Sequence, residues 1–475
     1  MGAGPGRYKG KSREITGQGR YDGKTQKNGI YVKGPFNVVL IVLDTMRADA
    51  VYPLETNERM PFLREFSKEC IVFKNAVSPA SWTIPAHASI FTGLYPSRNG
   101  VIERVNGEIP NYSDLFEKYE GDTISENLSK RGYKTIGFSQ NLLIAPDTSF
   151  SRGFDEFYYT HNPNQDIYFR MLENYNKIIK NYGSSFKEIL PKINSISKFR
   201  KFISLYSTLK KDTKKLNNSD LRDKGGQKVI DRIEELNLKE PFFIFINLME
   251  MHDPHDNKSL NLGWADSFFR ENQLPLKFVE EVRKSYHEAT KTTDEILSRL
   301  INNLKERKIL DKTILIITAD HGQCLMEKEE FFGHGTFLYD ELIKVPLIIR
   351  MPNGDKFNVK DGFQSTSKIK GFIEGVLEGY NIFDSITEDF VFSECYGSLD
   401  KEIERYSGNK KYREVLEKID RSRKAIFYKD YKLVVDMKDK KIEELKKLNG
   451  ENGINKTDKI VGEMTDLIDI FSWSG

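Results

Sequence analysis

The chain has 475 residues, 38% of them hydrophobic, and its formal net charge is only +3. This length suits one large α/β domain or two smaller ones, and so small a net charge argues against nucleic acid as a partner. The mean hydropathy is −0.54 and the longest apolar runs have the length of a strand, so the sequence predicts no transmembrane segment.

The N-terminal segment is rich in Gly, Lys and Arg, and we expect a disordered basic tail over residues 1–34. It contains no apolar stretch typical of a secretory signal, which predicts a cytoplasmic protein. The cysteines, Cys70, Cys324 and Cys395, are widely spaced and odd in number, so neither a disulfide framework nor a zinc knuckle is indicated.

Nearly continuous apolar runs predict strands that are buried on both faces of a sheet. In chain order these runs are residues 36–43, 241–248, 313–318 and 345–350, with a weaker strand at 134–139. Helical periodicity fills the gaps, at residues 61–68, 123–131, 276–308 and 369–377. Strands that alternate with helices predict an α/β domain over residues 35–388, with a mostly parallel central sheet flanked by helices.

Two segments have a different pattern. Residues 166–236 are Lys-rich and helical, and we expect an insertion that covers the site; a solvated face on a packed helix is favoured over a membrane-surface helix. Residues 389–475 contain short strand signals, including a hairpin of residues 425–428 and 431–436. They predict a small C-terminal antiparallel subdomain.

The run from Ser81 to Gly93 places a hydroxyl side chain at the start of a helix. Pro85 suits a first helical turn, so Thr83 is expected to be the N-cap. A hydroxyl there lies beside free backbone N–H groups and the positive end of the helix dipole, which lowers the cost of ionising it. Taken by itself Thr83 is more simply a cap, and Ser81 is the reserve nucleophile.

Acidic and imidazole side chains follow the predicted strands. Asp44 ends the first strand, and Asp320 and His321 end another. Active sites of α/β folds collect beyond the carboxyl ends of strands, and two carboxylates with an imidazole can hold a divalent cation, with Thr83 as a further ligand. Five of the seven histidines lie at strand exits or in Gly- or Pro-containing loops, namely His87, His252, His255, His321 and His334.

Together these motifs resemble the sulfatase family of the alkaline phosphatase superfamily. The family's nucleophile frame has a Cys or Ser, then Pro, Ser and Arg, then Thr-Gly, and the residues from Thr83 to Gly93 fall into it without a gap. Other similar segments are residues 36–44 (the first strand), 252–255 (His-x-Pro-Tyr), 320–322 (the second metal motif) and 334–336 (Lys-Gly-Thr). The resemblance covers residues 36–351 and implies an alkaline phosphatase-like fold and a metal-dependent sulfatase or phosphoesterase.

The departures from the family pattern limit this inference. Thr83 stands where sulfatases that form formylglycine need Cys or Ser, and its Cβ methyl prevents conversion to that aldehyde. His87 replaces the Arg of the frame, Thr45 replaces a second Asp, and His334 replaces the substrate-binding Lys. Threonine nucleophiles do occur in this superfamily, among phosphodiesterases and phosphoglycerol transferases.

Three functions stay open. The first is hydrolysis of sulfate or phosphate esters through a covalent intermediate on Thr83, with His252, His334 and His87 as further catalytic residues. The second is a binuclear phosphodiesterase or phosphotransferase, with a second cation on His255 and His334 together with His252, and with Glu250 or Asp253 as alternatives for a further ligand. The third is a non-catalytic binding protein on the same fold.

The site residues expected from the sequence have three roles. The cation, Ca, Mg, Mn or Zn, is expected on Asp44, Asp320, His321 and Thr83. Arg47 and Asn141 are expected to bind substrate, a small-molecule, glycan or lipid ester. The leaving group and the oligomeric state are not readable from the sequence.

Overall fold

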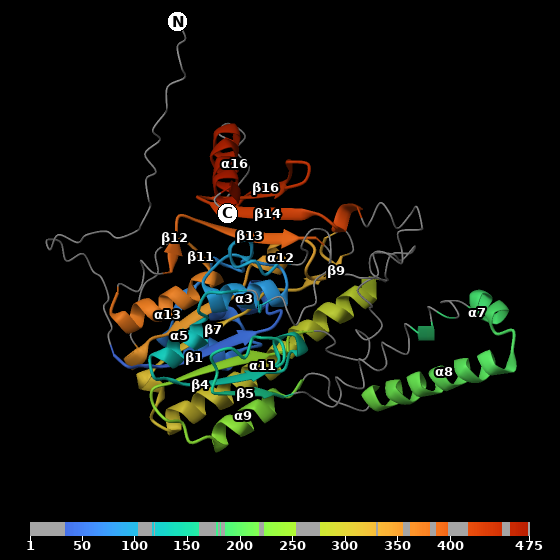
Figure 1. Cartoon of the computed structure of the whole chain (residues 1–475), viewed down its shortest axis with the longest axis horizontal. Helices are drawn as coiled ribbons and strands as arrows, with labels where there is room; N and C mark the ends of the chain where they lie inside the picture. Colours follow the sequence, from blue (N-terminus) through green and yellow to red (C-terminus); the bar gives the residue numbers. More distant parts are fainter. Residues whose placement is uncertain are drawn as a thin grey trace, which may run out of the picture.

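A seven-stranded sheet forms the centre of the molecule (Figure 1). Its strands, in order across the sheet, are β2 (Ile71–Phe73), β10 (Leu347–Arg350), β7 (Thr313–Thr318), β1 (Asn37–Leu43), β6 (Phe242–Leu248), β4 (Lys134–Ser139) and β5 (Glu156–Tyr159). This computed structural model describes residues 34–102, 116–117, 119–160, 177–178, 181, 186–217, 223–252, 276–328, 331–354, 362–380, 386–397, 417–448 and 457–473. The expected tail therefore lies almost wholly outside the described residues.

The sheet is mostly parallel, as the sequence predicts. Strand β1 lies at its centre, parallel to both β6 and β7, and every residue of these three strands is buried. Strand β10 is the exception, because it pairs antiparallel with both β7 and β2. Between β7 and β10 the described chain holds two strands of two residues each and the four-residue helix α12 (Asp340–Ile343), so it contains no helix long enough to run back along the sheet and start a parallel strand.

Helices cover the sheet on both sides (Figure 1). Helix α5 (Ile124–Lys130) begins one residue later than expected because Thr123 is its N-cap. The Thr123 hydroxyl accepts from the Glu126 amide at 3.2 Å while the Glu126 carboxylate accepts from the Thr123 amide at 2.8 Å, which forms a capping box. The other helices around the sheet are α1 (Ala48–Val51), α2 (Pro61–Phe66), α3 (Thr83–Thr92), α4 (Pro96–Asn99), α9 (Gly226–Glu235), α11 (Leu276–Glu306) and α13 (Ile369–Glu378).

The C-terminal part is antiparallel, as expected. Its sheet has the order β13 (Phe390–Tyr396), β14 (Ser422–Tyr428), β15 (Tyr431–Asp436) and β16 (Lys441–Lys447), and helix α16 (Thr457–Trp473) packs on it. The Ser97 amide and hydroxyl each donate to the Glu394 carboxylate at 2.8 Å, and the Glu394 amide donates to Pro79 O at 2.9 Å. The sheet therefore holds the chain on either side of α3.

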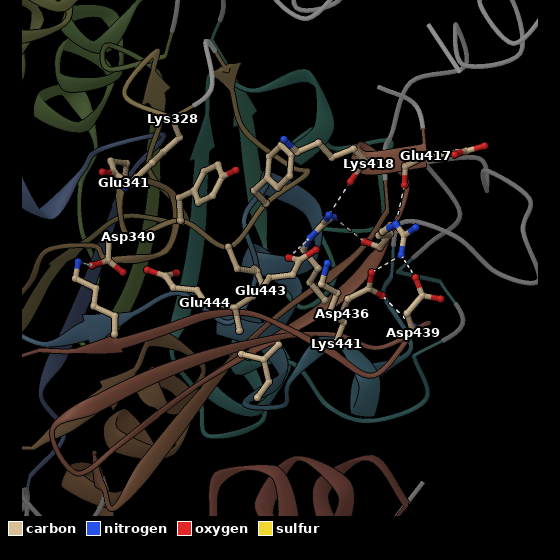
Figure 2. Close-up of a pocket in the computed structure, with 18 residues that line it drawn as sticks. Lys328, Asp340, Glu341, Glu417, Lys418, Asp436, Asp439, Lys441, Glu443 and Glu444 are labelled. Atoms are coloured by element: carbon tan, nitrogen blue, oxygen red, sulfur yellow. Dashed lines mark hydrogen bonds and ion pairs between the residues drawn. The ribbon is translucent and has the colours of Figure 1, made fainter. Parts of the chain in front are cut away.

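Short strands complete the fold. One small sheet joins β12 (Thr387–Glu388), β11 (Phe363–Ser365) and β3 (Ala76–Val77), and another pairs β8 (Cys324–Leu325) with β9 (Phe332–Gly333). A pocket of about 700 Å³ opens between β14–β16 and the segment of residues 337–341 (Figure 2). Charged side chains line most of it, and Arg423 Nε contacts Glu443 at 2.7 Å across its wall.

Within the expected insertion, the described residues are mainly helical. Helices α7 (Phe186–Lys192) and α8 (Ile196–Asn217) precede α9 and lie away from the central sheet in Figure 1. Other parts of residues 166–236 are outside the described residues, and the expected domain boundaries stay predictions. In the described part of the chain no helix is long and apolar enough to span a bilayer.

A pair of glycine substitutions tests this packing. A Cβ on Gly153, which has φ of +76°, would clash with the backbone of Glu126, whereas a Cβ on Gly371 in α13 meets nothing within 4 Å. We expect Gly153→Ala to lower the free energy of unfolding by roughly 1–3 kcal/mol, and Gly371→Ala to raise it by about 0.5–1 kcal/mol. Urea titration of both variants measures the two changes. Equal effects of the two substitutions would contradict the described contact between Gly153 and α5.

Candidate active site and metal centre

Thr83 is the first residue of helix α3 rather than its cap. The N-cap position is held by Trp82 in an extended conformation (φ −157°, ψ 168°), and no side chain caps the helix, so the N-cap prediction was wrong. The Thr83 hydroxyl instead faces another segment of the chain, with Oγ1 3.3 Å from His321 Nε2. Thr83 is only 3% exposed. Its hydroxyl is therefore directed into a buried cluster at the positive end of α3.

The cluster lies where β1 and β7 end. Asp44 follows β1 and Asp320 with His321 follows β7, and because the two strands are parallel neighbours, their carboxyl ends meet at one edge of the sheet. One ligand atom from each of the three side chains lies within 4.8 Å of the others, and all three residues are fully buried. The structure thus brings together the metal ligands expected from the sequence.

Each carboxylate of the cluster has one oxygen held and one left toward the centre. Asp44 Oδ2 accepts from Asn141 Nδ2 at 2.8 Å, and Asp320 Oδ1 accepts from the amides of Thr45 at 3.1 Å and His321 at 2.7 Å. Among the described residues, the other two oxygens, Asp44 Oδ1 and Asp320 Oδ2, are buried without a hydrogen bond. Buried oxygens in this state are costly unless a cation or a proton meets them.

The His321 ring likewise has one nitrogen held by a hydrogen bond and the other directed to the cluster. Its Nδ1 lies 2.8 Å from the carbonyl of Gly322, so Nδ1 carries the proton and Nε2 presents a lone pair to the cluster. A backbone partner on one ring nitrogen and an open lone pair on the other is the usual arrangement of a metal-binding histidine. The position after it requires glycine, because a Cβ on Gly322 would clash with the carbonyl of Glu341.

Burial sets the protonation of these groups. It raises the pKa of Asp320 to about 7 and also raises the pKa of Asp44, which the neighbouring Asp320 raises further. Burial lowers the pKa of His321 to about 4, so this imidazole is neutral at neutral pH. Two carboxylates that resist ionisation side by side, with a neutral imidazole lone pair, form a donor set that fits a divalent cation.

His87 supports the first turn of α3. Its Nδ1 lies 2.9 Å from the Thr83 carbonyl and 3.5 Å from Asp320 Oδ2, and its Nε2 lies 3.3 Å from Asn247 Nδ2. The ring is fully buried, and burial lowers its pKa. These contacts make His87 a positioning residue for Thr83, and the expected catalytic role stays a prediction.

His252 and His334 lie together beside the cluster. Their ring centroids are 5.3 Å apart, and the centroid of His334 is 4.5 Å from that of His321. His334 Nδ1 contacts Gln323 Oε1 at 2.7 Å, and burial together with the neighbouring imidazoles holds the pKa of His334 well below its usual range. His255, the other residue expected at a second cation, lies outside the described residues.

The described residues contain one group of three or more side chains able to hold a metal, namely Asp44, Asp320 and His321. A second cation on His255 and His334 therefore stays a prediction. The loop of residues 334–336 is fixed by backbone contacts, because the Gly335 amide donates to Ser81 O at 2.9 Å and Arg423 Nη1 donates to Thr336 O at 3.2 Å. This loop ties the C-terminal sheet to the chain just before Thr83.

The two residues expected to bind substrate have other partners. The Arg47 guanidinium pairs with Asp49 and Glu327, each at 2.5 Å, and also donates to the Gln323 carbonyl at 3.2 Å. Asn141 holds the Asp44 carboxylate through its amide. Both therefore position the loops around the cluster, and contact with substrate stays a prediction for each.

Two functional neighbours escaped the sequence reasoning. Asn247, which contacts His87, is the one polar residue within the apolar strand β6, and Gln323, which contacts His334, directly follows the Asp-His-Gly motif. A polar residue inside a doubly buried strand needs a buried partner, and that signal was available for Asn247. The pairing of Gln323 with His334 depends on the β8–β9 turn and had no sequence signal.

Comparison with known proteins gives a family and a fold. A family model described as Sulfatase matches residues 36–373. The chain is 24% identical to an ulvan-active sulfatase of Formosa agariphila, over 67% of this chain and 57% of the relative. It is 22% identical to arylsulfatase K of Mus musculus, over 71% of this chain and 60% of the relative. It is also 24% identical to an endo-4-O-sulfatase of Bacteroides thetaiotaomicron, over 66% of this chain and 62% of that relative. The chain thus spans less than two thirds of the length of these relatives.

Solved structures agree on the architecture. A phosphonate monoester hydrolase from Silicibacter pomeroyi superposes with a TM-score of 0.59 at 16% identity, covering 91% of this chain and 94% of that one. The phosphonate monoester hydrolase of Agrobacterium radiobacter superposes with a TM-score of 0.58 at 16% identity, covering 92% of this chain and 95% of that one. At such identities the likeness establishes the alkaline phosphatase-like fold alone.

The raised pKa of Asp320 predicts how pH affects the metal-free protein. Because the folded state holds this proton up to about pH 7, against an ordinary pKa of 3.8, wild-type stability should fall as pH rises between these values. Asp320→Asn removes this titration. As pH rises across that window, we therefore expect the free energy of unfolding of the variant to increase relative to that of the wild type by roughly a few kcal/mol. Urea unfolding of both proteins in EDTA measures the difference.

Adding a divalent cation serves as the control for that measurement. It should stabilise the wild type at pH 7 and leave Asp320→Asn nearly unchanged, since the variant lacks one charged ligand. A stability difference that does not change with pH, or equal stabilisation of both proteins by the cation, would rule out this description of the cluster.

Proposed function

This chain belongs to the sulfatase family, and from that premise we propose that it hydrolyses sulfate or phosphate esters with Thr83 as the nucleophile. One observation carries the proposal. The Thr83 hydroxyl lies 3.3 Å from His321 Nε2, beside two buried carboxylate oxygens that have no hydrogen bond among the described residues. A hydroxyl that only stabilised the helix would bond to the backbone of α3, and this one does not cap it.

The residues that would hold a cation are Asp44, Asp320 and His321, with Thr83 completing the set. A divalent cation bound there supplies Lewis-acid chemistry, lowering the pKa of the hydroxyl and offsetting negative charge on the ester. The chain prepares the site through fixed hydrogen bonds, from Asn141 to Asp44 and from the Thr45 amide to Asp320. The backbone N–H groups at the start of α3 add partial positive charge near the reacting atoms.

The chemistry proceeds by two displacements. Thr83 Oγ1 gives its proton to solvent water and forms a bond to sulfur or phosphorus, the bond from that atom to the leaving-group oxygen breaks, and that oxygen takes up a proton. Water then attacks the same sulfur or phosphorus, and the bond from that atom to Thr83 Oγ1 breaks. A proton of the attacking water restores the Thr83 hydroxyl, and the sulfate or phosphate product leaves. Threonine takes part directly because the methyl group on its Cβ excludes the aldehyde route.

We assign the proton for the leaving oxygen to His252. The Nδ1 proton of His334 is directed to Gln323 Oε1, and its lowered pKa leaves Nε2 without a proton at neutral pH. His334 therefore accepts hydrogen bonds at that nitrogen. His252 is half-buried, lies at the exit of β6 and packs edge-on against His334, so it is the better-placed acid.

The charge balance of the site favours a substrate with a single negative charge. The imidazoles of His87, His321 and His334 are neutral at neutral pH because burial lowers the pKa of each. Of the described cations near the cluster, Arg47 pairs with Asp49 and Glu327, and the Lys224 ammonium donates to the backbone carbonyls of Glu250 and His252. Sulfate monoesters and phosphodiesters carry one charge, so we propose them ahead of phosphate monoesters, which carry two.

The substrate class follows only in part from relatives. The ulvan-active sulfatase and the endo-4-O-sulfatase support including a sulfated glycan among the compounds tested. Metal analysis separates the remaining alternatives. One equivalent per chain supports this mechanism, two equivalents would favour the binuclear phosphodiesterase, and none would favour a binding protein.

Substituting Thr83 tests the nucleophile. We expect Thr83→Ala to lower kcat at least about a thousandfold on nitrophenyl sulfate or on a nitrophenyl phosphodiester, because the atom that attacks is removed. Thr83→Ser should keep measurable turnover. The matched control is Ser81→Ala, which removes another buried hydroxyl two residues away whose oxygen has no hydrogen bond among the described residues. Full activity in Thr83→Ala, or loss only in Ser81→Ala, would exclude the proposal.

Leaving groups of different basicity test His252. A poor leaving group needs the proton more than nitrophenolate does, so His252→Gln should slow an alkyl ester by about a hundredfold and a nitrophenyl ester much less. His334→Gln should slow both esters to a similar degree. The check is the slope of log kcat against leaving-group pKa in the three proteins. A slope that His252→Gln leaves unchanged would mean that another group supplies the proton.

A further inference from the structure

Helix α8 exposes a continuous row of large apolar side chains. Ile196, Phe199, Ile203 and Tyr206 recur at helical spacing and are 74%, 50%, 44% and 51% exposed. We refer to these four residues as the apolar stripe. Among the described residues ten large hydrophobic side chains are exposed, and five of them belong to the stripe or to Leu190 of the preceding helix α7. Such a concentration marks a contact surface.

Next to the apolar stripe, α8 has a less exposed side. Phe202, Leu205 and Leu209 are half-buried, and Asp212 is only 3% exposed. The sequence predicts a solvated face on a packed helix, and packing of α8 on another element stays a prediction. Its outward face differs from that expectation because it carries the apolar stripe rather than polar groups alone.

The exposed charges of α8 all have one sign. Lys210 and Lys214 continue the line of the stripe at four-residue spacing, while Arg200 and Lys211 run along one edge of it, and all four are exposed. The sole acidic residue of the helix sequence is Asp212, which is buried. The outward face therefore combines apolar area with positive charge and no negative charge.

This combination discriminates among partners. A second copy of the chain would bring two cationic faces together, and like charges across an interface oppose association. A soluble polyanion would pair with the cations but would leave the apolar stripe in water. An anionic bilayer satisfies both, because the acyl boundary takes up the apolar side chains while the headgroups meet the cations.

We propose that α8 lies in the plane of an anionic lipid surface, with the apolar stripe at the acyl boundary and the cations among the headgroups. The helix would hold the enzyme at the surface without crossing it. This contact is independent of the catalytic centre, since none of its residues contributes to the metal cluster.

Vesicle flotation of the full chain tests the proposal. We expect binding to vesicles of phosphatidylcholine mixed with phosphatidylglycerol, weak binding to phosphatidylcholine alone, and release by high salt. Phe199→Ser combined with Ile203→Ser should lower the partition coefficient at least about tenfold. Lys210→Gln combined with Lys211→Gln should lower it only on anionic vesicles. Turnover of a soluble nitrophenyl ester should be the same in all of these proteins.

The matched control is Tyr380→Ser combined with Ile470→Ser. Tyr380 is 62% exposed and lies beyond the end of α13, and Ile470 is 67% exposed and lies on α16. Because neither belongs to α8, their loss should leave vesicle binding unchanged. A gain-of-signal variant, Phe199→Trp, should show a blue-shifted emission with anionic vesicles, which does not depend on a loss of binding.

Three results would overturn the proposal. The first is that the wild type does not float with anionic vesicles. The second is that the variant with Phe199→Ser and Ile203→Ser floats as well as the control variant. In the third, sedimentation velocity without lipid would show a wild-type dimer that the same variant abolishes, which would make the stripe an interface between copies.

Discussion

The structure depends on two carboxylates that are buried side by side. Asp44 and Asp320 end neighbouring parallel strands, and the burial that the sheet imposes raises the pKa of both. Hydrogen bonds from Asn141 and the Thr45 amide hold one oxygen of each and leave the other two directed to the centre. Two buried carboxylates that repel each other and lack a positively charged partner are stabilised when a cation binds to them.

The surroundings serve to place one hydroxyl against that pair. Helix α3 is buried over its whole length, and its first turn is held by His87 through the Thr83 carbonyl. The C-terminal sheet contributes from the other side, because Glu394 binds the chain both before and after α3. Thr83 thus sits at the meeting point of the central sheet and the C-terminal sheet. The start of α3, which lacks a capping side chain, is therefore held by contacts from both sheets.

Strands and site ligands could be predicted because their signals are local. The apolar runs at β1, β6 and β7 are continuous, and the acidic residues at their ends identified the edge where Asp44, Asp320 and His321 meet. The opposite direction of β10 could not be read in the same way, since it depends on whether the connection from β7 forms a helix that crosses back along the sheet, and this one does not. The helix start at Thr83 was misplaced by one residue because a threonine before a proline is typical of an N-cap.

Long-range partners were beyond the sequence for a physical reason. The guanidinium of Arg47 finds Glu327, 280 residues away, so only the folded chain shows that its charge is neutralised. The same holds for the apolar stripe of α8, whose periodicity was visible but whose outward direction was not. Exposure is a property of packing, and two faces of one amphipathic helix cannot be assigned to core and surface without the neighbours.

In the proposed mechanism the hydroxyl of Thr83 forms the covalent ester. Acid quenching during turnover of an aryl ester, followed by peptide fragmentation, tests it most directly. We expect a sulfuryl or phosphoryl group on Thr83, present with a divalent cation and absent with EDTA. The same group located on Ser81 or on a histidine would contradict it.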